Sequence, residues 1–181
     1  MDGFLRAAAA VVTETGYERA TMSAIAERAH SCIGSLYQFF PNKRSIAEAL
    51  RAQCIKDIEQ SWTALERQAA GLSAEHLACR LVGLQIAIVK SHPALLALLD
   101  VPPTSRTPAR RELIRARIAA VLIAQKPRMS RATALRTASI VQQVSKGLLT
   151  LYAKSDADGK IAMIEEFKCV LTGYLVPKLK V

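Results

Sequence analysis

Residues 21–43, TMSAIAERAHSCIGSLYQFFPNK, constrain the fold more than any other stretch of the chain. Thr21 is suited to cap a first short helix, because its hydroxyl can accept one of the unpaired N–H groups at a helix start. Pro41 ends a second short helix, since a proline disfavours helical geometry in the residue before it. Asn42 is then placed to cap a longer helix that begins at Lys43.

Each of the two short helices carries one apolar face. The face of the first consists of Ala24, Ile25 and Ala29, and the inward face of the second is predicted to consist of Ile33, Leu36 and Phe40. Helices this short are not stable alone in water, so they must pack against neighbouring helices. This arrangement is typical of a helix-turn-helix unit, whose second helix lies in the major groove of DNA.

The same stretch resembles a known protein family. The matching residues are Thr-Gly-Tyr at 15–17, Thr21, Ile25-Ala26 with Ala29, and the run IGSLYQFFPNK at 33–43. On these residues, Phe4 to Leu50 looks like the DNA-binding domain of the TetR family of bacterial transcriptional regulators. The resemblance implies an all-α fold, with a helix-turn-helix DNA-binding domain at residues 1–45 and a helical ligand-binding and dimerisation domain at residues 46–181. Hydrophobic periodicity predicts about nine helices in total.

Eight residues of the first domain are candidates for DNA contact. Ser35, Gln38 and the backbone at Gly34 are expected on the outward side of the second helix, and Tyr37 and Lys43 match the family's phosphate-binding positions. The full set is Thr21, Arg28, Ile33, Gly34, Ser35, Tyr37, Gln38 and Lys43. Two alternatives stay open: Gly34 can serve a tight packing contact, and Arg28 can be a solvated charge. Phe39 and Phe40 are interpreted as core and docking residues rather than as base-stacking residues.

The turn between the two short helices departs from the family pattern. His30 stands where relatives usually have glycine, and Cys32 stands where they usually have a serine cap. A left-handed backbone at residue 30 is therefore expected to be strained, because histidine tolerates it less well than glycine. A cysteine at a helix start can have a depressed pKa, so a reactive thiol and a tolerated substitution are both open at position 32.

The charge of the chain is unevenly distributed. The formal net charge is +10, yet residues 1–50 hold five Lys/Arg against five Asp/Glu. The densest basic region is 106–136, where nine Lys/Arg accompany Glu112 alone. A strongly basic DNA-binding surface is the usual electrostatic signature of such domains. The neutral first domain lacks this signature, so a protein-interaction module that uses the basic 106–136 face is an alternative function.

The later helices suggest where a small molecule can bind. A helix over 74–90 has a wide apolar arc, which is typical of a helix buried on most sides, and Gln85 falls inside that arc. On a long helix that Ser130 caps, Ser145 and Tyr152 fall within the apolar arc and Gln142 at its edge. Gln85, Gln142, Ser145 and Tyr152 are therefore the candidate ligand-binding residues, for a small and largely apolar effector. The alternative is that the two glutamines bond to neighbouring backbone.

The final helix, predicted from about Lys160 to Val176 before Pro177, has two apolar rows. One row contains Ile161, Ile164, Leu171 and Leu175, and the other contains Met163, Phe167, Val170 and Tyr174. Two rows need two partners, so the helix is either fully buried or shared with a second subunit. The resemblance implies the second arrangement, a homodimeric four-helix bundle. A dimer also suits binding to the two half-sites of a near-palindromic DNA operator.

Other functional classes find little support in the sequence. No nucleophile elbow, phosphate-binding loop or H-E-x-x-H motif is present, so neither an enzyme nor a bound cofactor is expected. His76 and Cys79 share one helix face but have no evident third ligand, so no metal site is expected. The four cysteines form no paired motif and no apolar run suffices for a membrane span, which suggests a cytoplasmic protein.

The sequence therefore favours a transcriptional regulator. The most specific hypothesis is a dimeric repressor that a small molecule releases from its operator. The alternative within the same class is a dimeric DNA-binding protein without an effector, in an architectural or activating role.

Overall fold

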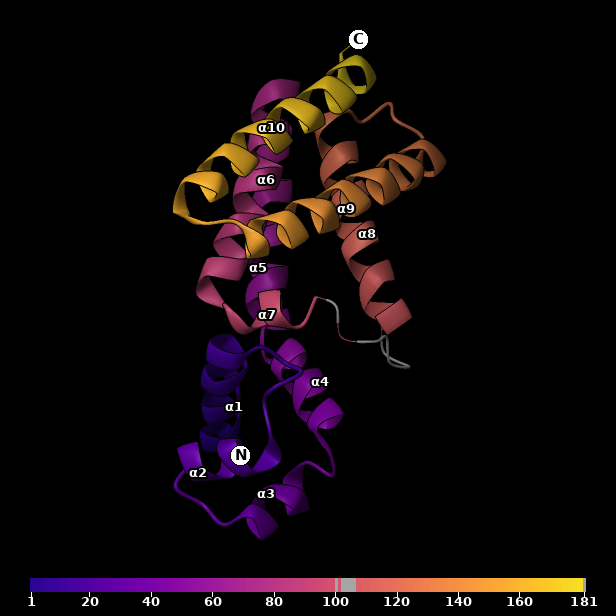
Figure 1. Ribbon diagram of the computed structural model, residues 1–181. Coiled ribbons are helices and arrows are strands. Elements are labelled where there is room, and N and C mark those ends of the chain that lie inside the picture. Colours follow the sequence, from indigo (N-terminus) through magenta and orange to yellow (C-terminus); the bar gives the residue numbers. More distant parts are fainter. Residues whose placement is uncertain (100, 102–106, 181) are drawn as a thin grey trace. The chain divides into compact units, whose positions relative to one another are not determined.

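A computed structural model describes residues 1–99, 101 and 107–180. Within these residues all regular structure is helical (Figure 1), which confirms the predicted all-α fold. The helices are α1 (Asp2–Thr15), α2 (Met22–Arg28), α3 (Ile33–Phe39), α4 (Lys43–Gln53), α5 (Ile55–Ala69), α6 (Ala74–Ser91), α7 (Ala94–Ala97), α8 (Thr107–Gln125), α9 (Arg131–Lys154) and α10 (Ala157–Leu179). The described part of the chain has one helix more than predicted, because a break at Cys54 divides the long helix expected from Lys43 into α4 and α5.

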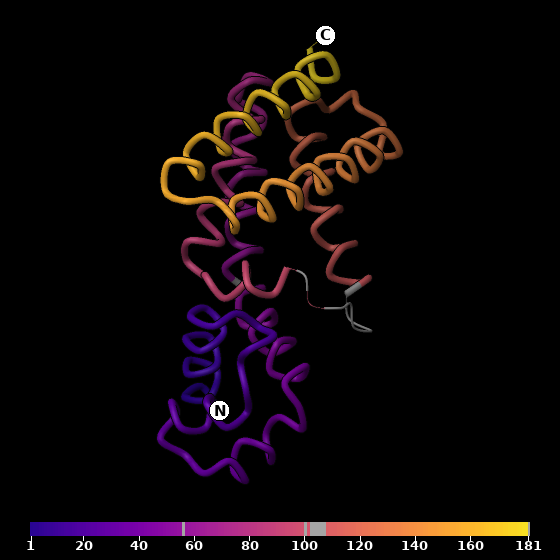
Figure 2. Tube along the Cα trace, in the orientation of Figure 1, coloured from indigo at the N-terminus to yellow at the C-terminus, as the bar shows by residue number. Residues whose placement is uncertain are grey.

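The chain forms two compact units. Unit 1 comprises Met1–Asp57 and Val89–Pro102, and unit 2 comprises Ile58–Ile88 and Pro103–Val181. The chain passes from unit 1 into unit 2 within α5 and re-enters unit 1 near the end of α6, a path that can be followed in Figure 2. The functional boundary predicted between residues 45 and 46 stays a prediction.

The core of unit 1 brings together side chains from five short helices. Val12, Ile25, Leu36, Ile46 and Leu98, from α1, α2, α3, α4 and the end of α7, are each no more than 2% exposed. Full burial of a side chain of this size stabilises a fold by about 1.5–3 kcal/mol. The α2 and α3 helices have only seven residues each. Their stability therefore comes from this packing rather than from intrinsic helix propensity.

Side-chain caps fix where α2 and α4 begin. The Thr21 hydroxyl accepts a hydrogen bond from the Ala24 N–H at 3.1 Å. Asn42 Oδ1 accepts from the Ser45 N–H at 2.9 Å, and the Asn42 N–H donates to the Ser45 hydroxyl at 3.4 Å, which together form a capping box. The caps predicted at Thr21 and Asn42 are thus confirmed. The α3 helix, which lies between α2 and α4 in the chain, begins without a side-chain cap.

The turn between α2 and α3 depends on His30. Its φ is +50°, the only positive φ among the described non-glycine residues. The His30 N–H donates to the Glu27 carbonyl at 2.9 Å and the Ser31 N–H to the Ala26 carbonyl at 3.0 Å. This hydrogen-bond pair is the Schellman motif, which needs a left-handed residue just after the helix and usually has glycine there. His30 therefore does adopt the left-handed conformation that is strained for a residue with a Cβ atom.

In unit 2, α9 packs against both α8 and α10. The largest fully buried side chains of this unit include Leu77, Leu81, Ile118, Leu122, Leu148, Leu171 and Leu175. The wide apolar arc predicted for α6 is confirmed, since Leu77, Leu81 and Val82 have no exposed surface. None of the described helices is both long enough and apolar enough to cross a bilayer.

The two ends of α10 differ from the prediction. Asp156 caps the helix by accepting from the Gly159 N–H at 2.8 Å, so residues 157–159 form its first turn instead of a separate loop. At the other end, Pro177 lies inside the helix rather than beyond it. Proline removes one backbone hydrogen bond. That loss is tolerated here because Leu179, two residues later, is buried and the Lys180 N–H still donates to the Val176 carbonyl.

We expect His30→Gly to stabilise unit 1 by about 0.5–1 kcal/mol, because glycine adopts φ +50° without steric strain. Chemical denaturation of both proteins measures the difference. His30→Ala retains Cβ and serves as the control, for which no such gain is expected. A loss of stability in the glycine variant would show that the imidazole makes a stabilising contact.

Candidate DNA interface and ligand site

The side of α3 that points away from the core is uncharged. Residues two apart on a helix differ in direction by about 200°, so Gln38 faces away from both Leu36 and Phe40. Leu36 is fully buried and Phe40 is 5% exposed, whereas Gln38 is exposed. Ile33 was predicted on the inward face but is 42% exposed. Leu36 and Phe40 already fill the space against the core, so Ile33 lies at the edge of the outward surface.

Gly34 lies on this outward surface. A Cβ atom built at Gly34 would meet no heavy atom within 4 Å. Packing against another helix therefore does not require glycine here, which removes the tight-contact alternative within the described structure. The absence of a side chain allows a ligand to approach the backbone closely. Ser35 is partly buried and Tyr37 is 48% exposed on the same helix.

The two phenylalanines at the end of α3 have different environments. Phe40 is buried in the core of unit 1, as predicted. Phe39 is 51% exposed, although its ring centroid lies 5.8 Å from that of Phe4 on α1. The core prediction is therefore wrong for Phe39. It rests on the edge of the α1 face because the core position of α3 is already occupied by Leu36.

Lys43 holds the connection between α1 and α2 in place. Its ammonium group donates to the Tyr17 carbonyl at 2.8 Å and to the Glu18 carbonyl at 2.9 Å. It also lies 4.5 Å from the centroid of the Tyr17 ring, a cation–π distance. An ammonium group has three donors, so one remains for a further acceptor such as a phosphate.

Arg28 is paired inside the protein. Its guanidinium donates to both carboxylate oxygens of Glu14 on α1, at 3.0 and 2.6 Å. This bidentate pair lowers the pKa of the Glu14 carboxyl and raises that of Arg28, chiefly through the hydrogen bonds between them. Arg28 is thus not the free solvated charge that one alternative predicted. A contact between Arg28 and a phosphate would have to compete with its ion pair to Glu14. Sequence reasoning missed Glu14, because its partner is fourteen residues away and on another helix.

Cys32 precedes α3 and is exposed. Its thiol makes no capping bond to the backbone and instead lies 3.1 Å from the Ser35 hydroxyl. Hydrogen bonding by Ser35 lowers the pKa of Cys32 below its ordinary value. Thr21, by contrast, uses its hydroxyl to cap α2 and remains exposed at the helix start. A helix start of this kind suits an anion such as a phosphate.

Two of the four candidate ligand residues meet in the core of unit 2. Gln85 on α6 and Ser145 on α9 are 8% and 9% exposed. Gln85 Nε2 donates to the Ser145 hydroxyl at 2.5 Å, and that hydroxyl donates to the Val141 carbonyl at 2.7 Å. Gln85 Oε1 is buried and accepts no hydrogen bond. The backbone-bonding alternative therefore does not hold for Gln85.

The other two candidates have separate environments. Gln142 Nε2 donates to the Arg111 carbonyl on α8 at 3.0 Å, which is the backbone bond that the alternative predicted. The Tyr152 side chain is 7% exposed, and the Lys160 ammonium lies 5.4 Å from its ring centroid. In the described structure neither residue is bonded to the Gln85–Ser145 pair. Both assignments stay predictions.

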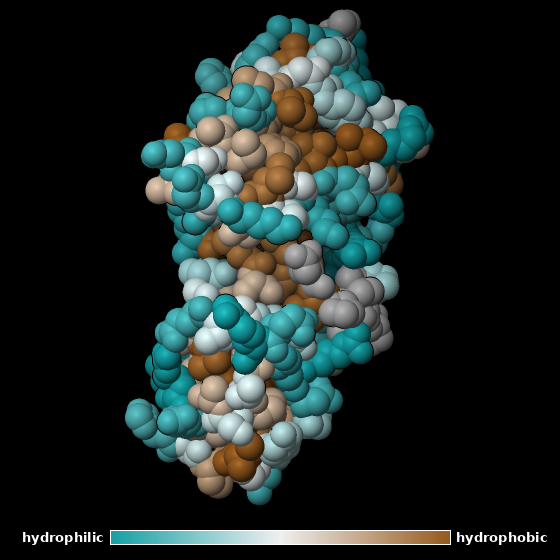
Figure 3. Space-filling view, in the orientation of Figure 1, coloured by the Kyte–Doolittle hydropathy of each residue, from teal (hydrophilic) through white to brown (hydrophobic). Residues whose placement is uncertain are grey.

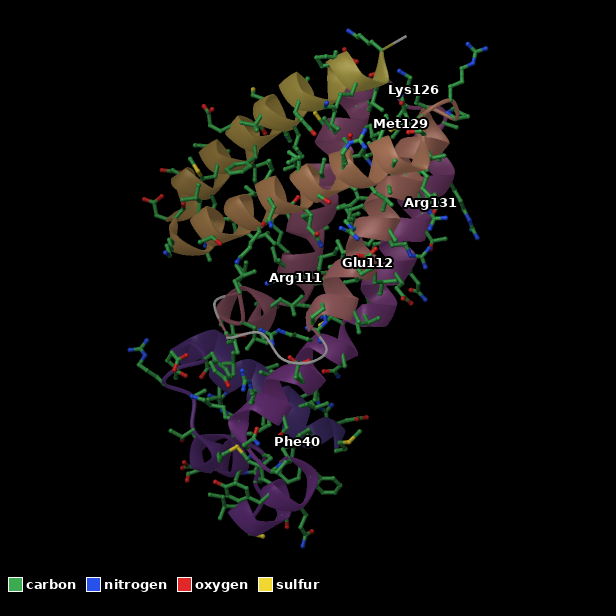
Figure 4. All side chains as sticks on the ribbon, turned by 90° about the vertical axis from the view of Figure 1, so that its right-hand side faces the viewer. Phe40, Arg111, Glu112, Lys126, Met129 and Arg131 are labelled. Carbon is green, nitrogen blue, oxygen red and sulfur yellow. The ribbon has the colours of Figure 1, made fainter. Side chains whose placement is uncertain are left out.

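The basic region covers α8 and the start of α9 (Figure 4). Several of its cations have partners: Arg115 pairs with Glu112, Arg117 Nη1 lies 4.0 Å from Glu66 Oε2, and Lys126 donates to the Lys178 carbonyl at 3.1 Å. Arg111, Arg128 and Arg131 are exposed, and Arg106 lies outside the described residues. Much of the positive charge thus serves contacts within unit 2.

Unit 1 contains a cavity of about 320 Å³ between α1, α4, the end of α6 and α7. Small side chains (Ala9, Ala10 and Ala94) line it together with Cys54 and His92. Burial raises the pKa of Cys54 to about 11, so its thiol is protonated and unreactive at neutral pH. His92 Nε2 lies 3.2 Å from Asp57 Oδ2. Among the described residues, no group of three His, Cys, Asp or Glu is arranged to hold a metal ion.

Comparison with protein families decides the identity of this architecture. Residues 4–50 match the model of bacterial regulatory proteins of the tetR family, and residues 73–175 match that of the tetracyclin repressor-like C-terminal domain. The chain belongs to the TetR family. It is therefore a DNA-binding transcriptional regulator, as the resemblance implied, and not an enzyme. Comparison with curated proteins by sequence gives no match.

Solved structures of TetR-type regulators have the same fold. Bacillus subtilis FadR in complex with stearoyl-CoA aligns with a TM-score of 0.73 at 16% identity, covering 97% of both chains. Salmonella enterica GusR aligns with a TM-score of 0.65 at 21% identity, covering 96% of this chain and 94% of its own. A TetR variant from Acinetobacter baumannii in complex with minocycline gives 0.61 at 18% identity, covering 96% and 93%.

We expect Lys43→Ala to weaken binding to all DNA sequences by a similar factor and to reduce the dependence of log K on log salt by about one unit, the value for one lost phosphate contact. Titrations of labelled DNA at several salt concentrations measure both. Lys154→Ala removes the same charge in unit 2 and serves as the control. An unchanged salt slope would show that Lys43 does not contact a phosphate and only holds the connection between α1 and α2.

Proposed function

We propose that this TetR-family protein is a homodimeric, cytoplasmic repressor that binds a near-palindromic operator through α3 and is released by a small molecule. The observation that carries the proposal is the Gln85–Ser145 pair inside unit 2. A buried oxygen without a hydrogen bond destabilises a fold by about 1–3 kcal/mol. Gln85 Oε1 is such an atom, and a bound effector would supply the missing donor.

The surroundings of Gln85 suggest the chemistry of the effector. Gln85 Oε1 is the buried atom that lacks a partner, so the open position is an acceptor. The buried neighbours along α6 and α9 are aliphatic, namely Leu81, Val82, Ile86, Val89, Val141 and Leu148. Ligand sites of this type are mostly apolar with a few polar groups that fix orientation. We therefore infer a small, largely aliphatic effector with a hydroxyl or N–H group, rather than a bare carboxylate.

Release from DNA follows from coupling between two sites. An effector that binds better to a state in which the two α3 helices are wrongly spaced for adjacent grooves weakens DNA binding. By the same linkage, operator DNA weakens effector binding by an equal factor. The complexes of FadR with stearoyl-CoA and of a TetR variant with minocycline support a ligand-binding role for unit 2.

We expect Gln85→Leu to retain operator binding and to lose the response to the effector. A compound that releases labelled operator from the wild-type protein is first selected by screening, and its effect is then measured on the variant. Leucine has a similar volume and leaves the Ser145 bond to Val141 intact, so the fold is retained. Gln143→Leu changes an exposed amide on α9 and should respond normally. If the effector releases the Gln85→Leu variant from operator DNA at the concentration that releases the wild type, the effector binds at another site.

The proposed dimer uses α9 and α10. Ile140 and Leu151 on α9 and Val170 on α10 are 47–50% exposed, although each is large and apolar. Figure 3 shows hydrophobic atoms gathered over α9 and α10. Contiguous exposed apolar surface of this kind marks an interaction site. In a two-fold dimer the same face of each subunit would cover the other, which is the four-helix bundle that the family resemblance implies.

We expect the double variant Leu151→Glu and Val170→Glu to be monomeric and to bind operator much more weakly, because it places charges in the proposed interface. Sedimentation measures the mass, and DNA titration measures the affinity. Leu113→Glu introduces the same charge at an exposed leucine of α8 and should remain dimeric. If the double variant sediments with the same mass as a dimeric wild type, the dimer does not form through this face of α9 and α10.

A further inference from the structure

The outward surface of α3 has a chemical character that limits which bases it can recognise. Its exposed side chains include an aliphatic group, a phenol and an amide, from Ile33, Tyr37 and Gln38. Residues 29–42 contain no lysine or arginine. The next cations along the chain, Lys43 and Arg44, belong to α4. The α3 helix therefore has no lysine, arginine, aspartate or glutamate that can enter a groove.

Two nearby cations, Arg28 and Lys43, are held in other contacts. Arg28 is bidentate to Glu14, and Lys43 donates to the carbonyls of Tyr17 and Glu18. The commonest specific contact to guanine is a bidentate arginine or lysine on its O6 and N7 atoms. A guanine contact of that kind would require one of these groups to leave its partner. The α3 helix itself thus offers no charged side chain for reading G·C pairs.

The same groups are well suited to A·T pairs. A glutamine amide has a donor and an acceptor, which match the N7 and N6 atoms of adenine in the major groove. Thymine alone presents a C5 methyl group there, and an aliphatic side chain can bury it. Gln38 faces directly away from the buried residues Leu36 and Phe40, and Ile33 has 42% of its surface exposed. Because Gly34 carries no side chain and has open space above it, the backbone between them can approach the bases.

We propose that α3 reads A·T base pairs, with Ile33 against a thymine methyl group and Gln38 on the edge of an adenine. The proposal rests on the proposed function, in which α3 lies in the major groove of the operator. It goes further by stating which bases are read and by which side chains. Specificity then arises from an amide and an apolar contact instead of from arginine.

The test begins with operator sites that the full-length protein selects from random DNA. Each thymine of a selected site is then replaced in turn by deoxyuridine, which lacks only the C5 methyl group. One thymine in each half-site should be sensitive, with a loss of about fourfold in affinity. That factor corresponds to the ~0.8 kcal/mol gained per buried carbon group.

Ile33→Ala tests the assignment of that methyl contact. The variant should bind the thymine and deoxyuridine operators equally, because the side chain that contacts the methyl group is gone. Ile33 is exposed, so its replacement leaves the core of unit 1 intact. Gln38→Arg should shift the preferred base at one position of each half-site from adenine to guanine. Thermal unfolding of both variants verifies that they are folded.

The possible outcomes separate this proposal from the proposed function. The selected sites could have G·C pairs at the positions that the α3 variants alter, or no replacement of thymine by deoxyuridine could change the affinity. Either result would show that α3 does not recognise A·T pairs in the proposed way, although α3 would still be the helix that contacts the bases. If a sensitive thymine exists but stays sensitive in Ile33→Ala, the assignment to Ile33 is wrong. If no DNA sequence is selected, or if Ile33→Ala and Gln38→Arg leave the selected sequences unchanged, the proposed function itself fails.

Discussion

The DNA-binding unit depends on the burial of a few side chains from helices that are too short to be stable alone. Ile25 and Leu36 are the main apolar anchors of α2 and α3, and neither has any exposed surface. The α2 helix packs against both α1 and α3, and the two anchors belong to one apolar core with side chains from α1, α4 and the segment around α7. With the inward side fixed in this way, the outward residues of α3 are held in a defined arrangement. That rigidity is what a helix needs in order to distinguish bases.

Electrostatics in unit 1 are organised around internal contacts. Arg28 and Lys43 connect α2 and α4 to neighbouring parts of the unit through Glu14 and through backbone carbonyls. Two of the five cations in the first fifty residues are therefore engaged within the unit. Phosphate contacts position a protein on DNA, whereas base contacts provide specificity. The base contacts that we propose come from the uncharged surface of α3.

Unit 2 contains a polar element in an otherwise aliphatic interior. Gln85 and Ser145 connect α6 to α9, and one oxygen of the pair is left without a donor. Buried polar groups are usually fully hydrogen-bonded, so an exception needs an explanation such as a bound molecule. The cavity in unit 1 is a different feature, since it is lined by small residues around α1 and α7 and contains none of the candidate ligand residues.

The sequence by itself determined the features that depend on neighbouring residues. Helix periodicity, the caps at Thr21 and Asn42, and the left-handed turn at His30 all follow from interactions within a few positions, so they could be predicted. The apolar arc of α6, with Gln85 inside it, was visible for the same reason.

Only the tertiary structure decided which distant groups meet. The Glu14 partner of Arg28, the carbonyl partners of Lys43 and the meeting of Gln85 with Ser145 join residues on different helices or across a connection. Exposure of Ile33 and Phe39 was also decided there, because Leu36 and Phe40 already occupy the core-facing side of α3. Local patterns show which face of a helix is apolar. They do not show how much of that face its neighbours have room to cover.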